Sequence, residues 1–316
     1  MASIRVNVDN FARAESDLMF SQLLRDSGAL GKWVHYRQIA GVDQQNIIRQ
    51  NRDTLYSAAI VDVSNGIAIV VPDTGGRYIS VMVVDQDHYI DHVIHDAGRH
   101  VFEPGEIPTQ YALLGVRILV NSEDPEDVRT VNTLQDQLSI AGEHSDSAPF
   151  VLPEYDQETQ KATRSALLEL ARGLDGFHRC FGNRDEVDPV RHLVGAAAGW
   201  GGLPEWEAFY LNIEPYLPVD EYTITVGEVP VDAFWSVSVY NAQGYFEEND
   251  REVYNINSVT AQRNPEGTIT INFGAGDADR PNYIPIMEGW NYMVLLYRPR
   301  KEILDGSWTF PELRRV

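Results

Sequence analysis

The chain of 316 residues contains a single cysteine, Cys180, and little that would direct it to a membrane. One cysteine can form neither an intramolecular disulfide nor a zinc site built from several thiolates. No apolar run approaches the ~20 residues that span a bilayer as a helix, and the N-terminus lacks the apolar core of a secretory signal. We therefore expect a cytoplasmic protein in which Cys180 is a small packing residue, with a nucleophilic thiol beside His178 as the alternative.

Basic residues are also scarce, because 25 Lys plus Arg stand against 47 Asp plus Glu, for a formal net charge of −22. So acidic a chain repels nucleic acid and anionic membranes, and neither is an expected partner. The charge favours solubility and indicates no catalytic role by itself. A small-molecule substrate and a second copy of the chain in a homodimer are the partners that it leaves open.

The signatures of several common enzyme sites are missing as well. The sequence has no GxxxxGK[ST], no GxGxxG after a strand, no HExxH and no GxSxG. These absences argue against nucleotide, dinucleotide, zinc-protease and serine-hydrolase sites, and no cofactor is expected. They do not argue against an enzyme, because function resides in sites that many folds can carry.

What the chain does contain is a substantial core, with 43% hydrophobic and 10% aromatic residues. Apolar residues at helical spacing predict a helix within residues 9–28, with Asp9 or Asn10 at its start and Gly28 at its end. The same reasoning predicts helices at 125–139, 157–174, 188–202 and, as a short one, 204–212. Runs of β-branched and aromatic residues predict strands at 54–63, 66–71, 77–84, 111–120, 221–227, 233–241, 252–256, 267–273 and 291–299.

This order of elements predicts a mostly β protein of the α+β class. We expect two β-sandwich or jelly-roll-like domains joined by a helical segment, with a helix at the N-terminus. The expected boundaries are 1–145, 146–215 and 216–316, with a polar linker at 141–156. The strand at 233–241 carries bulky residues on both of its faces, so we expect both faces to be covered.

Four of the eight histidines fall in one short segment among several aspartates: His88, His92, His95 and His100. Imidazole and carboxylate together can move protons near neutral pH or bind a transition metal. In a helix His88, His92 and His95 would share a face, whereas in a strand His95 would point away from the other two. Neighbouring Tyr and β-branched residues favour the strand, so the segment is a polar surface cluster, an acid/base site or, less favoured, a metal site.

A second candidate is the stretch QNRDTLYS, where a loop enters a predicted strand. Arg52 and Asp53 could form an orienting ion pair beside a pocket, with Tyr56 as a hydrogen-bond donor. Alternatively, Asp53 satisfies backbone groups of the turn. Arg77 could bind a substrate carboxylate with its fork of donors or neutralise Asp53 or Asp85.

Aromatic residues of the last third form a third candidate, among them Trp235, Tyr240 and Trp290. Such residues could line an apolar pocket. They are also what the core of a β-sandwich requires, so both interpretations stay open.

The sequence also resembles two bacterial families that occur as a pair. QNRDTLYSAAIVDVS and VPDTGGRYISVMVVDQDHY resemble the family catalogued as domain of unknown function 1254. VPVDAFWSVSVYNAQGYFEEN and PNYIPIMEGWNYMVLLYRPRKEILDGSWTFPELRRV resemble domain of unknown function 1214. The resemblance covers nearly the whole chain outside the middle helices and implies two β-rich domains joined by helices, but no particular activity.

The residues that fall on the first family's pattern refine the candidate site: Asn51, Asp53, Thr54, Tyr56, Arg77, Tyr78, His88, Tyr89 and His95. His92 and His100 do not fall on it, which favours an acid/base pair of His88 and His95 over a metal. This chain has Leu295 where many members carry an arginine, so an anion-binding role of that position is not expected here.

From these features we expect a small-molecule enzyme with its pocket between the two β domains. His88 would be the general acid or base, assisted by His95 or Tyr89, and Asp53 would hold Arg52. Substrate would contact Asn51, Tyr56, Arg77, Trp235, Tyr240 and Trp290. The expected chemistry is non-redox: hydrolysis, elimination, cyclisation or isomerisation. A metal enzyme using His88, His92 and His95, and a protein that binds a small molecule without catalysis, are the alternatives.

Overall fold

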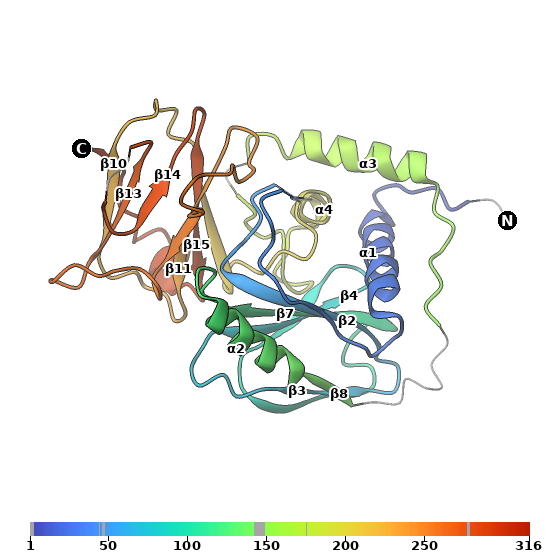
Figure 1. Ribbon diagram of the computed structural model, residues 1–316. Helices are drawn as coiled ribbons and strands as arrows, with labels where there is room; N and C mark the ends of the chain where they lie inside the picture. The colour runs from blue at the N-terminus through green and yellow to red at the C-terminus, as the bar shows by residue number, and fades with distance from the viewer. Residues whose placement is uncertain (1–2, 44, 46–47, 142–148, 175, 277–278) are drawn as a thin grey trace. The chain divides into compact units, whose positions relative to one another are not determined.

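The chain folds into two compact units (Figure 1). The computed structural model describes all residues except 1–2, 44, 46–47, 142–148, 175 and 277–278. The first unit comprises residues 1–37, 55–120 and 124–204, and the second comprises 38–54, 121–123 and 205–316. The expected fold class, mostly β with an N-terminal helix, is confirmed.

Two sheets form the frame of the first unit. The larger has the strand order β1 (Val34–Tyr36), β2 (Thr54–Asp62), β7 (Tyr111–Leu119), β4 (Ile79–Asp85), β5 (Ile90–Ile94). The smaller has the order β6 (Gly98–Phe102), β3 (Ile67–Val71), β8 (Ser139–Ala141). Strands β2, β4 and β7 are buried almost throughout, as their long β-branched runs predict for strands covered on both faces.

Four helices complete the first unit: α1 (Phe11–Ser27), α2 (Pro125–Asp136), α3 (Gln157–Leu170) and α4 (Pro189–Ala198). Helices α1, α3 and α4 contact one another, and Figure 1 shows them above the larger sheet, with β3 and β8 below it. Helix α4 begins as the sequence predicts, with Pro189 in its first turn and the Asp188 carboxylate accepting hydrogen bonds from the N–H groups of Val190 and Arg191. The middle helices α3 and α4 are thus part of the first unit, whereas the sequence suggested a separate connector.

The second unit is a sandwich of two four-stranded sheets. One has the order β14 (Tyr283–Pro285), β13 (Ile269–Gly274), β10 (Tyr222–Val226), β16 (Arg314–Arg315). The other has the order β12 (Asn255–Asn257), β11 (Trp235–Tyr240), β15 (Asn291–Tyr297), β9 (Ala208–Ile213), and α5 (Lys301–Leu304) follows β15. Side chains from both sheets share one core, and β11 is buried along its whole length, as its two bulky faces predict.

The short helix expected at 204–212 is wrong, because β9 is an edge strand paired with β15. Its apolar residues Phe209, Leu211 and Ile213 alternate, and all three pack against the sandwich core. A period of two fits a strand with one face on a core, and that tertiary contact outweighs the local helical preference.

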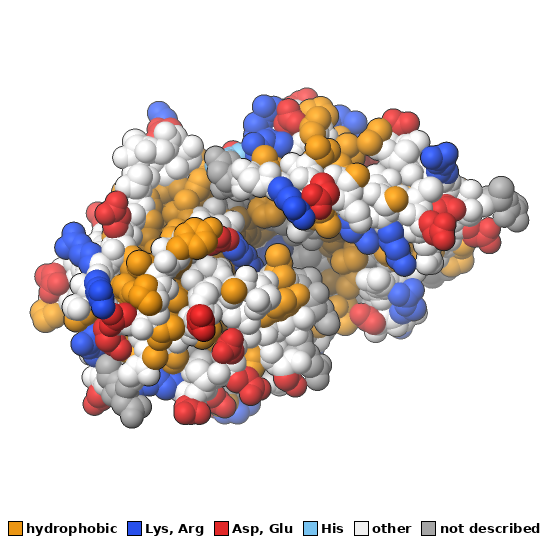
Figure 2. Space-filling model, turned by 90° about the horizontal axis from the view of Figure 1, so that it is seen from above, with side chains coloured by type: hydrophobic (Ala, Val, Ile, Leu, Met, Phe, Trp, Pro, Cys, Tyr) orange, Lys and Arg blue, Asp and Glu red, His pale blue; other side chains and the backbone are white. Residues whose placement is uncertain are grey.

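Within the described residues, no helix has the length and apolar character needed to cross a bilayer. The face seen in Figure 2 carries acidic and basic side chains interspersed, with no large area of a single sign. Of the linker expected at 141–156, residues 142–148 lie outside the described part of the chain, and Tyr155 forms a parallel bridge with Ile4.

Candidate functional site

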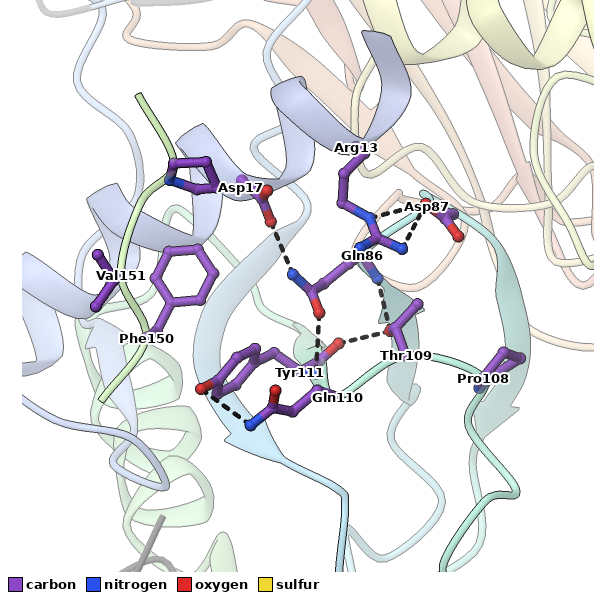
Figure 3. A pocket seen from close by; sticks show the side chains of 11 residues that line it. Arg13, Asp17, Gln86, Asp87, Pro108, Thr109, Gln110, Tyr111, Phe150 and Val151 are labelled. Carbon is purple, nitrogen blue, oxygen red and sulfur yellow. Dashed lines mark hydrogen bonds and ion pairs between the residues drawn. The ribbon is translucent and has the colours of Figure 1, made fainter. Parts of the chain in front are cut away.

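A pocket of about 410 Å³ opens beside α1 in the first unit (Figure 3). Its walls come from α1, from the turn after β4, from the loop that leads into β7, and from the segment before α3. We call it the Asp17 pocket; it is lined by Arg13, Asp17, Gln86, Asp87, Pro108, Thr109, Gln110, Tyr111, Phe150, Val151 and Pro153.

Asp17 is the most deeply buried ionisable residue of this lining, with 2% of its surface exposed. One carboxylate oxygen accepts a hydrogen bond from Gln86 Nε2 at 2.8 Å, and the other accepts from the Tyr155 hydroxyl at 2.8 Å. Burial raises the pKa of Asp17 above its ordinary value, and the two hydrogen bonds oppose that shift. A carboxyl group in such surroundings can exchange a proton closer to neutral pH than a surface aspartate can.

Helix α1 can bury Asp17 because its inward face is partly polar. Glu15, Ser16 and Asp17 are all buried, and each has a partner inside the first unit. Arg164 forms an ion pair with Glu15 at 2.6 Å, and Trp200 Nε1 donates to Ser16 Oγ at 3.0 Å. Hydrogen bonds and ion pairs with these partners offset the free-energy cost of removing the three polar side chains from water.

The rim of the pocket holds an ion pair between α1 and the turn after β4. Arg13 Nε lies 2.8 Å from Asp87 Oδ1, and Arg13 Nη2 lies 2.7 Å from the same oxygen. Both side chains are about one-third exposed, 36% and 35%, so solvent screens the pair and it contributes little to stability. Its consequence for the pocket is that the Arg13 fork is already engaged, as Figure 3 shows.

The back of the pocket is a hydrogen-bonded frame that fixes Gln86. The Gln86 backbone N–H donates to Thr109 Oγ1 at 3.0 Å, and Gln86 Oε1 accepts from the Tyr111 N–H at 3.2 Å. The Phe150 ring meets the Tyr111 ring edge-on, with centroids 5.2 Å apart. The pocket therefore combines a buried carboxyl group, an oriented amide and an aromatic wall.

His88, the predicted acid or base, lies behind the turn that carries Gln86 and Asp87. It has no exposed surface and a left-handed backbone with φ of 68°. His88 Nε2 accepts the Gly201 N–H at 2.8 Å, and the ring stacks on Trp200 with centroids 5.4 Å apart. Burial and the neighbouring His192 lower the pKa of His88 to about 3, so the ring is neutral at ordinary pH.

Asp85 stabilises the same turn through hydrogen bonds to its backbone. Its Oδ1 accepts from the N–H groups of Asp87 and Tyr89, both at 2.8 Å, while burial raises its pKa to about 6. Tyr89 stacks on the His192 ring at 4.4 Å, and His192 Nε2 donates to the Asp87 carbonyl at 3.0 Å. The segment that the sequence marked as unusual thus forms the support of the pocket wall, with Asp87 and Gln86 facing the pocket.

His95 does not join His88. Its ring lies against Tyr78, and its Nδ1 is 2.7 Å from the Ile79 carbonyl, at the start of β4. His88 follows the end of β4, a strand of 7 residues, so the two rings are separated by roughly 20 Å of strand.

His92 Nε2 lies 3.4 Å from Glu106 Oε1, and His100 Nε2 lies 2.8 Å from the carbonyl oxygen of Asp96. In the part of the chain that the structure describes, no three His, Cys, Asp or Glu side chains come together as metal ligands would.

Asp53 is also fully buried, but it lies in the second unit. Its carboxylate accepts from Ser236 Oγ at 2.5 Å, from Asn255 Nδ2 at 2.7 Å and from Asn257 Nδ2 at 3.2 Å. Burial raises its pKa despite these three bonds. Asn51 Oδ1 caps the Asp53 N–H at 2.7 Å. The loop before β2 is thereby bound to β11 and β12.

The two arginines expected to orient substrate have partners within the fold. Arg52 donates to the Ala40 carbonyl, and its guanidinium carbon lies 4.9 Å from the centre of the Tyr254 ring. Arg77 forms a bidentate ion pair with Asp127 of α2, rather than with Asp53 or Asp85. Neither arginine lines the Asp17 pocket.

The remaining residues that were expected to contact substrate are not part of this pocket's lining either. Trp235 and Trp290 belong to the sandwich core. The Tyr240 hydroxyl donates to the Gln50 carbonyl at 3.1 Å, and the Tyr56 ring lies under Arg117 at 5.5 Å. Asn51 Nδ2 donates to the Tyr297 hydroxyl at 2.7 Å.

Sequence reasoning missed Asp17, although one signal was present. In a helix, residues three apart share a face, and Asp17 stands midway between the buried residues Ala14 and Phe20. A carboxylate on the buried face of a helix is costly unless it is hydrogen-bonded or paired, so its presence there signals a specific role in structure or function.

Comparisons with known proteins agree with the resemblance seen in the sequence. Residues 30–142 match the family described as protein of unknown function DUF1254, and residues 214–301 match the one described as protein of unknown function DUF1214. A search of curated proteins finds no relative.

Among solved structures, a protein of Vibrio parahaemolyticus is 19% identical, with a TM-score of 0.72 over 98% of this chain and 97% of its own. A protein of Burkholderia cenocepacia is 14% identical, with a TM-score of 0.56 over 98% of this chain and 87% of its own. At these identities the likeness concerns the fold alone. The chain thus matches the first family in its N-terminal part and the second in its C-terminal part, in the order that the sequence resemblance implies.

Proposed function

We propose that the protein binds a small polar molecule in the Asp17 pocket and carries out non-redox acid/base chemistry on it, with Asp17 exchanging the proton. The observation that carries this proposal is a carboxyl group, 2% exposed, in the wall of a pocket of about 410 Å³. That volume suits a small metabolite.

The chemistry follows from the surroundings of Asp17. Because burial raises its pKa, the carboxyl group spends more of its time protonated than a surface aspartate does and can both donate and accept a proton. Gln86 and Tyr155 hold its two oxygens in place, which fixes the direction of transfer. The reaction class remains hydrolysis, elimination, cyclisation or isomerisation, as the sequence suggested, but with Asp17 in the role first assigned to His88.

The test is a search for turnover with matched variants. Purified protein is incubated with a mixture of small polar metabolites, and mass spectrometry follows which compounds disappear and which products form. We expect consumption of at least one compound, a loss of about a hundredfold in rate for Asp17→Asn, and full activity for Asp26→Asn. Asp26 is an exposed residue of the same helix, so its variant makes the same charge change outside the pocket. Turnover that is equal in Asp17→Asn and wild type would refute the assignment.

Binding without catalysis is the second candidate, and one observation favours it. Both oxygens of Asp17 already accept hydrogen bonds from protein donors, which limits the access of a substrate proton. This candidate requires a compound that is retained by the protein, released unchanged on denaturation, and lost from the Asp17→Asn variant.

A further inference from the structure

We infer that the Asp17 pocket takes a small organic cation, specifically a primary ammonium group on a short apolar body. This inference rests on the proposed function and names its substrate class. It follows from three features of the lining: its charge, its aromatic wall and the engagement of its one arginine.

The charge of the lining is negative when Asp17 is ionised. The pocket walls contain two carboxylates, Asp17 and Asp87, and one guanidinium, Arg13. Arg13 and Asp87 compensate each other at the rim. Among the residues that the structure describes, Asp17 has only neutral hydrogen-bond donors, Gln86 and Tyr155, and Arg13 acts on its charge only from a longer distance. An ammonium group beside it would supply a counterion in direct contact.

The aromatic wall suits the same class of ligand. Phe150 lines the pocket and packs against Phe20 at 6.3 Å and against Tyr111 at 5.2 Å, so its ring is held in a fixed orientation. Phe150 and Asp17 both belong to the lining of the pocket, as labelled in Figure 3. An aromatic ring in the wall can attract an ammonium ion through the quadrupole of the ring. The ring together with Val151 and Pro153 also gives the apolar body of the ligand a surface to contact.

An anionic ligand fits the pocket less well. Arg13 is the one cationic side chain of the lining, and its charge is already compensated by Asp87, which its Nε and Nη2 contact. An anion would also meet the carboxylate of Asp17 in a site partly removed from water, which is unfavourable.

The experiment compares two probes that share a carbon chain and differ in charge, n-butylammonium and n-butanol. Isothermal titration calorimetry at low ionic strength measures the affinity of each for wild type, Asp17→Asn, Phe150→Ala and Asp26→Asn. We expect n-butylammonium to bind wild type and Asp26→Asn alike and to lose about tenfold in affinity in Asp17→Asn, the change typical of removing one partner of a close charge pair. Phe150→Ala should weaken the same probe, and n-butanol should bind more weakly and be insensitive to Asp17→Asn.

The possible results separate this inference from the function on which it rests. If n-butanol binds as tightly as n-butylammonium, and Phe150→Ala weakens both while Asp17→Asn weakens neither, the pocket binds small molecules and the cation inference is overturned. If neither probe binds wild type, both the inference and the proposed pocket fail. Thermal unfolding of each variant shows whether it is folded. If Asp17→Asn does not fold, Phe150→Ala still tests the inference, which requires that this variant no longer binds n-butylammonium more tightly than n-butanol.

Discussion

His88 combines complete burial with a backbone conformation that few residues adopt. Its φ of 68° is costly for most side chains, whereas asparagine tolerates it well. Its ring accepts one backbone hydrogen bond, from Gly201, and its Nδ1 has no hydrogen-bond partner among the described residues. These features describe a neutral ring that holds the turn after β4 in place, and they make His88 a source of acid sensitivity.

We predict that the free energy of unfolding falls between pH 7 and pH 5 in part because of His88. Its folded pKa, about 3, lies below the ordinary value of 6.5, so its contribution is present above pH 6.5 and is lost as pH falls toward 3. Over the interval from pH 6.5 to pH 5 this amounts to about 2 kcal/mol. His88→Asn keeps the left-handed backbone and removes the titrating ring, so urea unfolding at the two pH values should show a difference smaller by about that amount.

Asp85 acts in the opposite direction, which makes the comparison between variant and wild type essential. Its folded pKa is raised to about 6, so its contribution to stability is lost as pH rises through that value. Since Asp85 is present in both proteins, subtracting one pH difference from the other isolates His88. An unchanged pH difference in His88→Asn would show that the ring titrates as an exposed histidine does.

At the residue scale, the sequence singled out the segment that contributes Gln86 and Asp87 to the pocket wall, but none of its candidate site residues lines the pocket. The density of His and Asp in residues 85–100 marked the turn that supports the pocket, because such composition is visible without a structure. The inward direction of Gln86 and Asp87, and of Asp17 on a distant helix, depends on tertiary partners such as Tyr155 and Thr109. No local pattern encodes those partners.

Among the elements, the loop at 38–54 stands out because it belongs to the second unit although β2 follows it directly. Gln45 bonds to the backbone of Phe246 through both ends of its amide, and the Arg49 N–H donates to the Gly244 carbonyl at 2.7 Å. Asp53 completes the attachment through Ser236 of β11. The motifs NRDT and FWSVS, which carry the two family resemblances, thus meet in a hydrogen bond inside the second unit.

We predict that Asp53→Ala loosens β11 and β12 and leaves the β6-β3-β8 sheet unchanged. The substitution removes the acceptor of Ser236, Asn255 and Asn257, which are buried or half-buried, and the loss should cost about 3 kcal/mol. Hydrogen–deuterium exchange read by mass spectrometry should show faster exchange in peptides covering 235–240 and 255–257. Asp43→Ala, an exposed position in the same loop, is the control and should exchange as wild type. Equal protection in both variants would mean that Asp53 does not hold the loop.

Element prediction succeeded where a strand is long and apolar and failed where it is short or lies at an edge. The buried strands β2, β4, β7, β11 and β15 were all expected, because long runs of β-branched and aromatic residues favour strands over helices. Strands β1, β8 and β14 have only 3 residues each, and their pairing is set by the neighbouring strand. Strand β9 looked helical because its alternation is short and its core partner is far away in sequence.

At the scale of the whole molecule, the fold class was readable from the sequence. Composition and the order of β-rich runs suffice to predict a mostly β protein. Neither unit is a continuous stretch of the chain, because residues 38–54 and 121–123 belong to the second unit together with residues 205–316. Which chain segments pack together is decided by long-range hydrogen bonds such as that between Asp53 and Ser236, and these have no signature in local composition.

Three of the buried polar residues described above, His88, Asp53 and Asp17, differ in their access to ligand. His88 and Asp53 have no exposed surface and are held by protein partners, whereas Asp17 borders a pocket. A buried titratable group marks a functional site only if a ligand can reach it. Asp17 is therefore the residue on which the proposed function depends.

The most direct test is a carbon-detected NMR titration of the Asp17 carboxyl group, with its resonance assigned by comparison with Asp17→Asn. We predict a pKa above the ordinary value of 3.8 in the free protein, because burial disfavours the charged form. We further predict that saturating n-butylammonium lowers this pKa, because the bound cation favours the ionised carboxylate. An ordinary pKa that stays the same when the probe is added would contradict both the proposed role of Asp17 and the assignment of its pocket.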